Sequence, residues 1–260
     1  MRLDTGTLAI LSALEYPSAV TVRIAEQLDR AAYTRTNKAL EALGGKWNRS
    51  AKAHVFDSDA RARIDHAITT GEVETGQDVG HFPTPAPLAR RLVEMADVRP
   101  KQHVLEPSAG TGRIVDAVLE IGDVQVYAVE RDAARRQSLS DRAGAMGHSG
   151  ALHVGQCEDF MTYPATGGFD RVVMNPPFCR VGLGDHLDHV RHAFGMLVEG
   201  GILVSVLPAS VTFRRDRRYL EFREWCEERG GLRPLPSGSF KDSGTGVETV
   251  VVRLEQERVS

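Results

Sequence analysis

The chain has few cysteines and no long apolar run. Its cysteines, Cys157, Cys179 and Cys226, are odd in number and show no Cys-x-x-Cys spacing, which disfavours a disulfide framework or a zinc site. No stretch approaches the roughly 18 apolar residues of a membrane-spanning helix. Residues 1–7 contain no basic segment followed by an apolar one. We therefore expect a cytoplasmic protein without a membrane span, a secretion signal or a bound metal.

The chain does contain enough apolar sequence for a full core. It has 260 residues, of which 42% are hydrophobic and 26% are charged. This composition is typical of a globular protein with one main domain and a smaller appendage. A polar, glycine-rich stretch without helical periodicity predicts a linker at 71–80. We therefore predict a small unit at 1–70 and a larger catalytic domain at 81–260.

The small unit has the pattern of an α+β, winged-helix-like module. Apolar periodicity and a pair of glycines predict helices at 7–14, 21–28 and 32–43. Residues 46–56 then predict a hairpin that forms the wing.

Basic residues gather in the third helix and the hairpin of this unit. Residues 30–52 contain six lysines and arginines and a single acidic residue. Clustering on one helix and a wing is typical of contact with nucleic-acid phosphates. The predicted contacts are Arg35, Lys38, Arg49 and Lys52. The alternative is a solvated face of a dimerisation or packing module, because residues 1–80 as a whole are not basic.

The most informative stretch is a β-branched strand that ends on Asn175-Pro176-Pro177-Phe178. The two prolines fix their own φ and disfavour helix before them, so the chain leaves the strand extended and stiff. Asn175 offers an amide oxygen, Pro176 a carbonyl without a ladder partner, and Phe178 a flat apolar face. These groups predict a site for an exocyclic amine on a flat π system, which two acceptors make more nucleophilic. The motif therefore predicts an alkyl acceptor, with Pro177 beside it.

A ligand loop is predicted upstream of this motif. A short strand runs into a small-residue turn, where Gly110 and Gly112 allow close approach of a ligand to the backbone. Glu130 ends the next strand, at the position where a βαβ unit presents an acid to ribose hydroxyls. Val115 stands where a dinucleotide fingerprint has its third glycine, which argues against NAD. Glu106, just before the turn, suits a positively charged ligand.

Together, these motifs resemble a known family over residues 80–255. The chain resembles class I S-adenosylmethionine-dependent methyltransferases, and most closely the adenine N6 DNA methyltransferases of bacteria, phages and plasmids. The resemblance implies a Rossmann-like, doubly wound α/β sheet with an antiparallel C-terminal edge strand. It implies S-adenosyl-L-methionine as the cofactor and catalysis by Asn175, Pro176 and Phe178. The cofactor contacts that it implies are Phe82, Thr84, Pro85, Glu106, Ser108, Gly110, Gly112, Glu130, Asp159 and Phe160.

The matched segments have distinct roles in the family. The segment 82–85 is similar to its Phe-x-Thr-Pro segment near the methionine moiety, and Glu130 to its ribose-binding acid. Asp159 and Phe160 are similar to the acid and the aromatic that contact adenine. Glu106 departs from the aspartate of many members but keeps its charge.

Two segments after the motif carry further candidates. A helix is predicted at 185–198, where His186, His189 and His192 recur every three residues. Residues with this spacing point in successively different directions around a helix, and these histidines flank a solvated face. We therefore expect no metal there. The predicted loop 209–218 carries Arg214 and Arg215, which we expect to contact the substrate backbone.

The predicted reaction is methyl transfer to the N6 amine of adenine in DNA. The same Asn-Pro-Pro chemistry serves an RNA adenine or a protein glutamine amide, and such folds also survive as non-catalytic cofactor-binding modules. The basic helix and wing favour nucleic acid over a protein tail, and the intact motif disfavours the inactive module. The net charge of −3 keeps RNA and protein substrates open. The sequence does not specify the recognition sequence or the oligomeric state.

Overall fold

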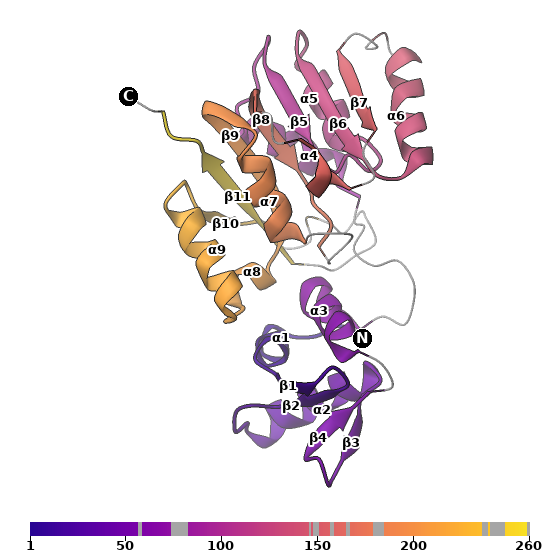
Figure 1. The fold of residues 1–260 in the computed structure, drawn as a ribbon, viewed down its shortest axis with the longest axis vertical. Helices are drawn as coiled ribbons and strands as arrows, with labels where there is room; N and C mark the ends of the chain where they lie inside the picture. The colour runs from indigo at the N-terminus through magenta and orange to yellow at the C-terminus, as the bar shows by residue number, and fades with distance from the viewer. Residues whose placement is uncertain are drawn as a thin grey trace.

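The computed structural model describes residues 1–56, 59–73, 83–145, 147, 151–156, 159–164, 167–178, 185–235, 239 and 248–258. Two sheets organise these residues (Figure 1). A four-stranded sheet lies in an N-terminal unit, and a seven-stranded sheet lies in a larger α/β domain. No helix in these ranges is both long and apolar enough to cross a bilayer.

Three helices and two hairpins form the N-terminal unit. Its elements are α1 (Thr5–Ser12), β1 (Glu15–Ser18), β2 (Thr21–Arg23), α2 (Arg30–Ala42), β3 (Lys46–Asn48), β4 (Ala53–Val55) and α3 (Ala60–Thr70). The strands are antiparallel, in the order β1-β2-β4-β3. All three helices contribute to a common core, which includes Leu11, Leu40 and Ile64. Arg2 pairs with Glu72 in an isolated antiparallel bridge, so the segments before α1 and after α3 lie side by side.

The helix predicted at 21–28 is wrong, because β2 occupies its first residues. Thr21 and Val22 pair with Val55 and His54 of β4, and Val22 is fully buried. Both are β-branched residues, which favour a strand where a partner strand is present. The other two helices and the β3–β4 hairpin are confirmed, with shifted ends. A second hairpin, β1–β2, stands where the second helix was expected.

The larger domain is a doubly wound sheet. Its strands are β5 (His103–Glu106), β6 (Gln125–Glu130), β7 (Leu152–Gln156), β8 (Phe169–Met174), β9 (Leu197–Pro208), β10 (Leu232–Pro234) and β11 (Thr249–Glu255). They lie in the order β10-β11-β9-β8-β5-β6-β7. The five strands from β9 to β7 are parallel, and β11 is antiparallel to its neighbours. The predicted Rossmann-like sheet is confirmed, and the short β10 lies outside β11 at the edge.

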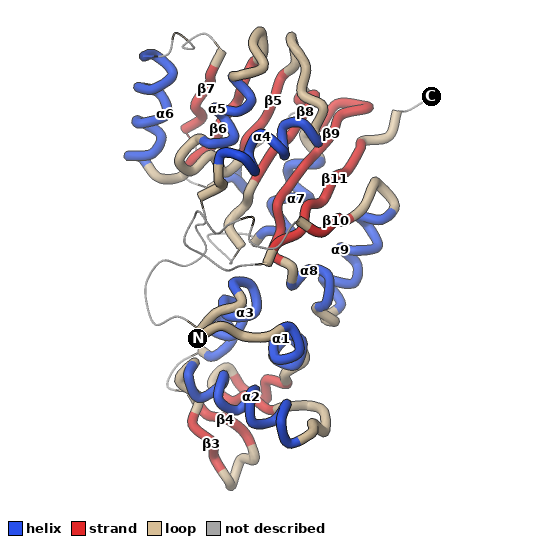
Figure 2. The backbone as a smooth tube through the Cα atoms, turned by 180° about the vertical axis from the view of Figure 1, so that it is seen from behind, coloured by secondary structure: helices blue, strands red, loops and turns tan. Residues whose placement is uncertain are grey.

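Helices cover both faces of this sheet (Figures 1 and 2). One face carries α4 (Ala86–Met95), α5 (Arg113–Leu119) and α6 (Ala133–Ala145), and the other carries α7 (His186–Phe194) and α9 (Arg217–Glu227). Residues 172–174 of the central β8 are all apolar and fully buried, because helices cover the strand on both sides. The strand order reverses between β5 and β8, so the carboxyl ends of these strands border a crevice.

Two boundaries after β8 differ from the prediction. The helix α7 ends at Phe194, and Leu197 pairs with Phe169 of β8, so strand pairing takes the end of the predicted helix. The predicted loop at 209–218 contains a short helix, α8 (Ser210–Phe213). This helix contacts α1, and Phe213 packs on the core of the N-terminal unit. The segment after β9 therefore joins the two units.

Candidate active site

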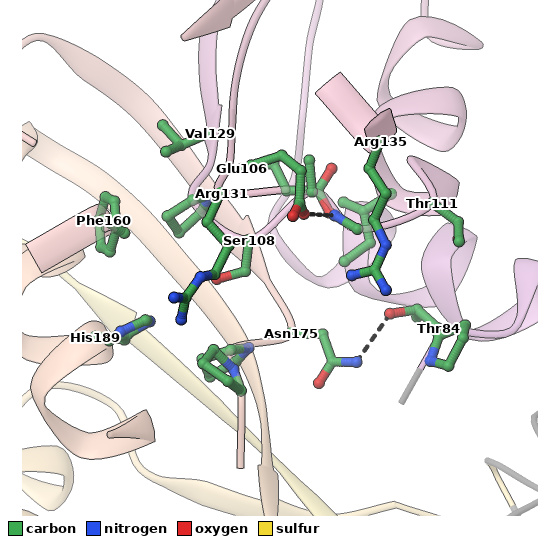
Figure 3. Close-up of a pocket in the computed structure, with 18 of the residues that line it drawn as sticks. Thr84, Glu106, Ser108, Thr111, Val129, Arg131, Arg135, Phe160, Asn175 and His189 are labelled. Carbon is green, nitrogen blue, oxygen red and sulfur yellow. Dashed lines mark hydrogen bonds between the residues drawn. The ribbon is translucent and has the colours of Figure 1, made fainter. Parts of the chain in front are cut away.

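A cavity opens at the carboxyl ends of β5, β6 and β8 (Figure 3). Its walls come from segments far apart in the sequence, which meet because parallel strands end at one edge of the sheet. The predicted residues that line it are Thr84, Glu106, Ser108, Gly110, Glu130, Asp159, Phe160, Asn175, Pro176 and Pro177. The structure thus brings most of the predicted cofactor contacts and the amine acceptors to one cavity.

Among the described residues, the predicted cofactor contacts Pro85 and Gly112 do not line the cavity. Phe82 lies outside the described residues, and Pro85 immediately precedes α4. Gly112 faces α6, because a Cβ built on it would clash with the side chains of Arg142 and Leu139. Its φ of +78° also favours glycine. Gly112 is therefore required by helix packing and backbone conformation, whereas Gly110 lines the cavity.

Glu130 holds the turn after β5. Its Oε2 accepts a hydrogen bond from the backbone N–H of Gly110 at 2.6 Å, and its Oε1 accepts one from Asp132 at 2.9 Å. The side chain is buried, so water competes little for these bonds. The carboxylate therefore connects the end of β6 to the ligand loop. Its contact with a ribose stays a prediction.

Glu106 places a buried carboxyl group against the same turn. Its Oε2 has no hydrogen-bond partner among the described residues. Burial raises the pKa of Glu106 well above its ordinary value, and the backbone N–H of Val115 opposes this rise. A buried oxygen without a partner is costly. A cationic ligand in the cavity would both satisfy this oxygen and favour the charged carboxylate.

The amide of Asn175 is oriented by Thr84. Its Nδ2–H donates to Oγ1 of Thr84 at 3.1 Å, a bond drawn as a dashed line in Figure 3. Because the amide nitrogen faces Thr84, the amide oxygen faces away from it. Thr84 was predicted as a cofactor contact, and the structure shows that it also fixes the predicted amine acceptor.

The ring of Phe178 does not face the cavity. It is 1% exposed and packs in the core on the α4 and α5 side of the sheet. The prediction that Phe178 offers a flat face to a base is therefore contradicted by its burial. The reason is that the chain turns the side chain inward directly after the two prolines, so the apolar ring is buried rather than left in water.

His189 lines the cavity beside Phe160 and was not predicted. The two ring centroids lie 5.6 Å apart in an edge-on arrangement. Neither ring nitrogen of His189 has a hydrogen-bond partner among the described residues, and burial lowers its pKa. A neutral imidazole offers one donor and one acceptor, which suits the edge of a heteroaromatic ring.

The solvated histidine face predicted for 185–198 is also wrong. His186 and His189 are only 1% and 4% exposed. Each is next in sequence to an apolar residue, Leu187 or Val190, that points into the core. The helical periodicity of these apolar residues was the sequence signal that could have predicted the burial of both histidines. Among the described residues, no group of three or more His, Cys, Asp or Glu side chains is placed to hold a metal.

The four basic residues predicted to contact phosphates lie on the N-terminal unit, and we call them the basic cluster. Arg35 and Lys38 lie in α2, and Arg49 and Lys52 lie in the turn between β3 and β4. All four are exposed. Figure 1 places the β3–β4 hairpin at the end of the molecule away from the larger sheet. The cluster is therefore accessible to a polyanion but does not line the cavity.

Arg214 is not the exposed substrate contact that was predicted. Its guanidinium lies 2.9 Å from carboxylate oxygens of both Asp65 in α3 and Asp216, and 4.5 Å from the ring centroid of Tyr219. Its side chain is only 14% exposed. Arg214 therefore links the N-terminal unit to the larger domain. Arg215 is exposed, and its contact with substrate stays a prediction.

The larger domain is similar to many solved structures. A candidate class I S-adenosylmethionine-dependent methyltransferase from Listeria monocytogenes matches with a TM-score of 0.55 at 18% identity, over 77% of this chain and 69% of that one. The modification subunit of a candidate type I restriction enzyme from Vibrio vulnificus matches with 0.55 at 17% identity, over 79% and 51%. A candidate RNA methyltransferase from Pyrococcus horikoshii matches with 0.50 at 19% identity, over 75% and 98%.

Searches against protein-family models and curated proteins give no match. At the low identities of the structural matches, the likeness concerns the fold. The larger domain therefore has the fold of class I methyltransferases.

Proposed function

We propose that the protein is an S-adenosylmethionine-dependent methyltransferase that acts on the exocyclic N6 amine of adenine in DNA. One observation carries this proposal. Asn175, Pro176 and Pro177 line the same cavity as the turn after β5, and Thr84 orients the amide of Asn175. An acceptor pair for a planar amine therefore lies beside a loop suited to a cationic nucleoside.

The residues present in the cavity suit S-adenosyl-L-methionine. Glu106 has a buried oxygen without a partner among the described residues, which suits a positive charge. Glu130 accepts two backbone hydrogen bonds, and a carboxylate has lone pairs left for a ribose hydroxyl. Phe160 and His189 offer a flat face and a polar edge for adenine. When bound, this cofactor supplies an electrophilic methyl group on a positively charged sulfur.

The substrate amine is held by the chain's own acceptors. The amide oxygen of Asn175 and the carbonyl of Pro176 accept its two hydrogens, which favours the pyramidal amine that attacks. Pro177 lies beside the base. No base is needed before attack, because the amine becomes acidic only after it gains the methyl group. In duplex DNA the adenine must leave the stack, since its paired amine faces the opposite strand.

Two observations favour nucleic acid as the substrate. The basic cluster is exposed on the N-terminal unit. That unit docks near the sheet edge where the cavity opens, because α8 follows β9 at this edge and contacts α1. We favour DNA because the family resemblance points to it, and the Vibrio vulnificus neighbour is named as part of a restriction enzyme. RNA adenine is the second candidate, since the Pyrococcus horikoshii neighbour is named as an RNA methyltransferase.

The test is transfer of labelled methyl groups to separate pools of DNA, RNA and protein, followed by digestion to nucleosides or amino acids. We expect N6-methyldeoxyadenosine without methylcytosine. A methylated ribonucleoside or methylated glutamine as the sole product moves the protein to the alternative substrate. Lack of product in every pool refutes the proposed activity. The matched control is Asn175→Ala, which removes the amide acceptor and should give no product in any pool.

A further inference from the structure

A chain of buried polar contacts runs from the end of the Asn-Pro-Pro-Phe segment into the interface between the units. Nδ1 of His186 lies 2.8 Å from the carbonyl oxygen of Phe178, and Nε2 of His186 lies 3.1 Å from the hydroxyl of Tyr219. His186 and Tyr219 are buried, with 1% and 5% exposure. The guanidinium of Arg214 lies over the ring of Tyr219 and forms an ion pair with Asp65 of the N-terminal unit.

The partners of His186 define its protonation state. A carbonyl oxygen only accepts, so Nδ1 carries the hydrogen and Nε2 accepts from the hydroxyl of Tyr219. Burial lowers the pKa of His186 to about 4, and the adjacent Asp185 opposes this shift. Burial also raises the pKa of Tyr219, which keeps its hydroxyl protonated. His186 is therefore a neutral imidazole in one tautomer, with both nitrogens engaged.

The helix that carries His186 is held firmly at this end. Asp185 caps α7 and receives both Nη atoms of Arg218 from α9, at 2.5 and 2.7 Å. Arg218 also lies 2.6 Å from Asp188. The imidazole therefore projects from a fixed point, and Figure 1 shows α7 and α9 on the same side of the sheet.

The hydrogen bond to Phe178 completes the anchoring of the tetrapeptide. At its start, Met174 pairs with Ser205 in the sheet, and Asn175 is held by Thr84. The two prolines have fixed φ, so the segment moves largely as one stiff piece. Fixing the carbonyl of Phe178 therefore also limits where the amide oxygen of Asn175 and the carbonyl of Pro176 point. Displacing such acceptors by about 1 Å typically costs up to a hundredfold in rate.

We propose that His186 is a positioning residue for the Asn175-to-Phe178 segment, and that Tyr219 holds it in the tautomer that donates to Phe178. The consequence for turnover rests on the proposed function. The anchoring itself is independent of any substrate, so the two are tested separately.

The substitutions His186→Leu and His186→Asn form a matched pair. Leucine retains apolar bulk but has no donor, whereas the amide nitrogen of asparagine lies near the position of Nδ1 and donates to the carbonyl. His153→Leu is the control, because it removes an exposed imidazole from β7, away from the motif. Tyr219→Phe keeps the ring and removes only the hydroxyl.

The first measurement is hydrogen–deuterium exchange of the peptide that covers 169–178, without any substrate. We expect faster exchange in His186→Leu, and exchange close to that of the parent in His186→Asn and His153→Leu. In the parent, nitrogen-detected NMR should show the tautomer with the proton on Nδ1 at neutral pH. The proposal is overturned if the peptide exchanges in His186→Leu at the same rate as in the parent, or if Nε2 of His186 carries the proton. Both outcomes are independent of what the protein methylates.

The second measurement is turnover on the nucleic acid that the parent methylates. We expect kcat to fall by about tenfold to a hundredfold in His186→Leu, with unchanged cofactor affinity and a loss within about threefold in His186→Asn. Tyr219→Phe should lie between these two. Equal losses in the leucine and asparagine variants, or parental kcat in both, refute the positioning role. If the parent methylates nothing, the proposed function is wrong, and the exchange measurement alone decides whether His186 anchors the segment.

Discussion

The buried, neutral His186 should make the larger domain sensitive to mild acid. Burial lowers its pKa from an ordinary value of 6.5 to about 4, with Arg214 and Arg218 adding to the shift and Asp185 opposing it. The unfolded chain therefore binds a proton between these two values that the folded chain excludes. The contribution of His186 to the free energy of unfolding is fully present above the pKa of the unfolded chain. It is lost as the pH falls from about 6.5 towards about 4.

The linkage relation converts this shift into a free energy. With these two pKa values, the free energy of unfolding falls by about 2 kcal/mol between roughly pH 7.5 and pH 5 because of His186 alone. The depressed pKa values of His54 and His189 add further losses of the same sign. The contribution of His186 is isolated by comparison with His186→Asn, since the other two histidines are common to both proteins.

The assay is urea unfolding followed by tryptophan fluorescence. The chain has two tryptophans. A Trp47→Phe background leaves Trp225, which packs against Phe194 and Phe222 in the layer formed by α7 and α9. We expect the difference in unfolding free energy between parent and His186→Asn to shrink by about 2 kcal/mol on going from about pH 7.5 to about pH 5. A difference that is independent of pH refutes the burial of a neutral His186.

Further predictions concern the cavity, the motif and the basic cluster. Asn175→Ala should lower kcat by more than about a hundredfold while calorimetry shows unchanged cofactor affinity, because an amine acceptor is lost. Glu106→Gln should weaken cofactor binding by about tenfold in the same measurement, since it removes a negative charge facing the ligand; equal affinity contradicts this role. Phe178→Ala should lower the free energy of unfolding by about 3 to 5 kcal/mol, because its ring is in the core, and a loss of activity without a loss of stability contradicts this placement. Reversing the charges of the basic cluster should reduce the salt dependence of nucleic-acid binding by about 3 to 4 in the log–log slope, and a parental slope identifies a packing module instead.

The strand ends of the site could be predicted because their signals are local. Glycines in a small-residue turn and a β-branched strand that ends on Asn175 and two prolines define strand ends whatever surrounds them. The parallel sheet then brings these ends together without further information. For this reason most of the predicted cofactor contacts, together with Asn175 and the two prolines, line the cavity.

The errors come from properties that depend on distant partners. Which way the ring of Phe178 turns depends on the space beneath α4 and α5, which no local pattern encodes. Arg214 was predicted to contact the substrate backbone, but it pairs with Asp65, which lies 149 residues away in the sequence. The strand β2 forms because β1 and β4 are available to pair with it on either side. His186 and His189 were predicted to flank a solvated face because of their three-residue spacing, whereas the apolar positions of their helix place both inside.

The attachment of the N-terminal unit bears on how such proteins diversify. The unit precedes the larger domain in the sequence, and its first and last described segments pair through Arg2 and Glu72. Its contacts with the larger domain include the Asp65–Arg214 ion pair and the packing of Phe213. A gene segment that encodes a different unit can therefore be exchanged here by recombination, provided that it restores these few contacts. Under the proposed function, such an exchange would replace the unit that carries the basic cluster and leave the cavity of the larger domain unchanged.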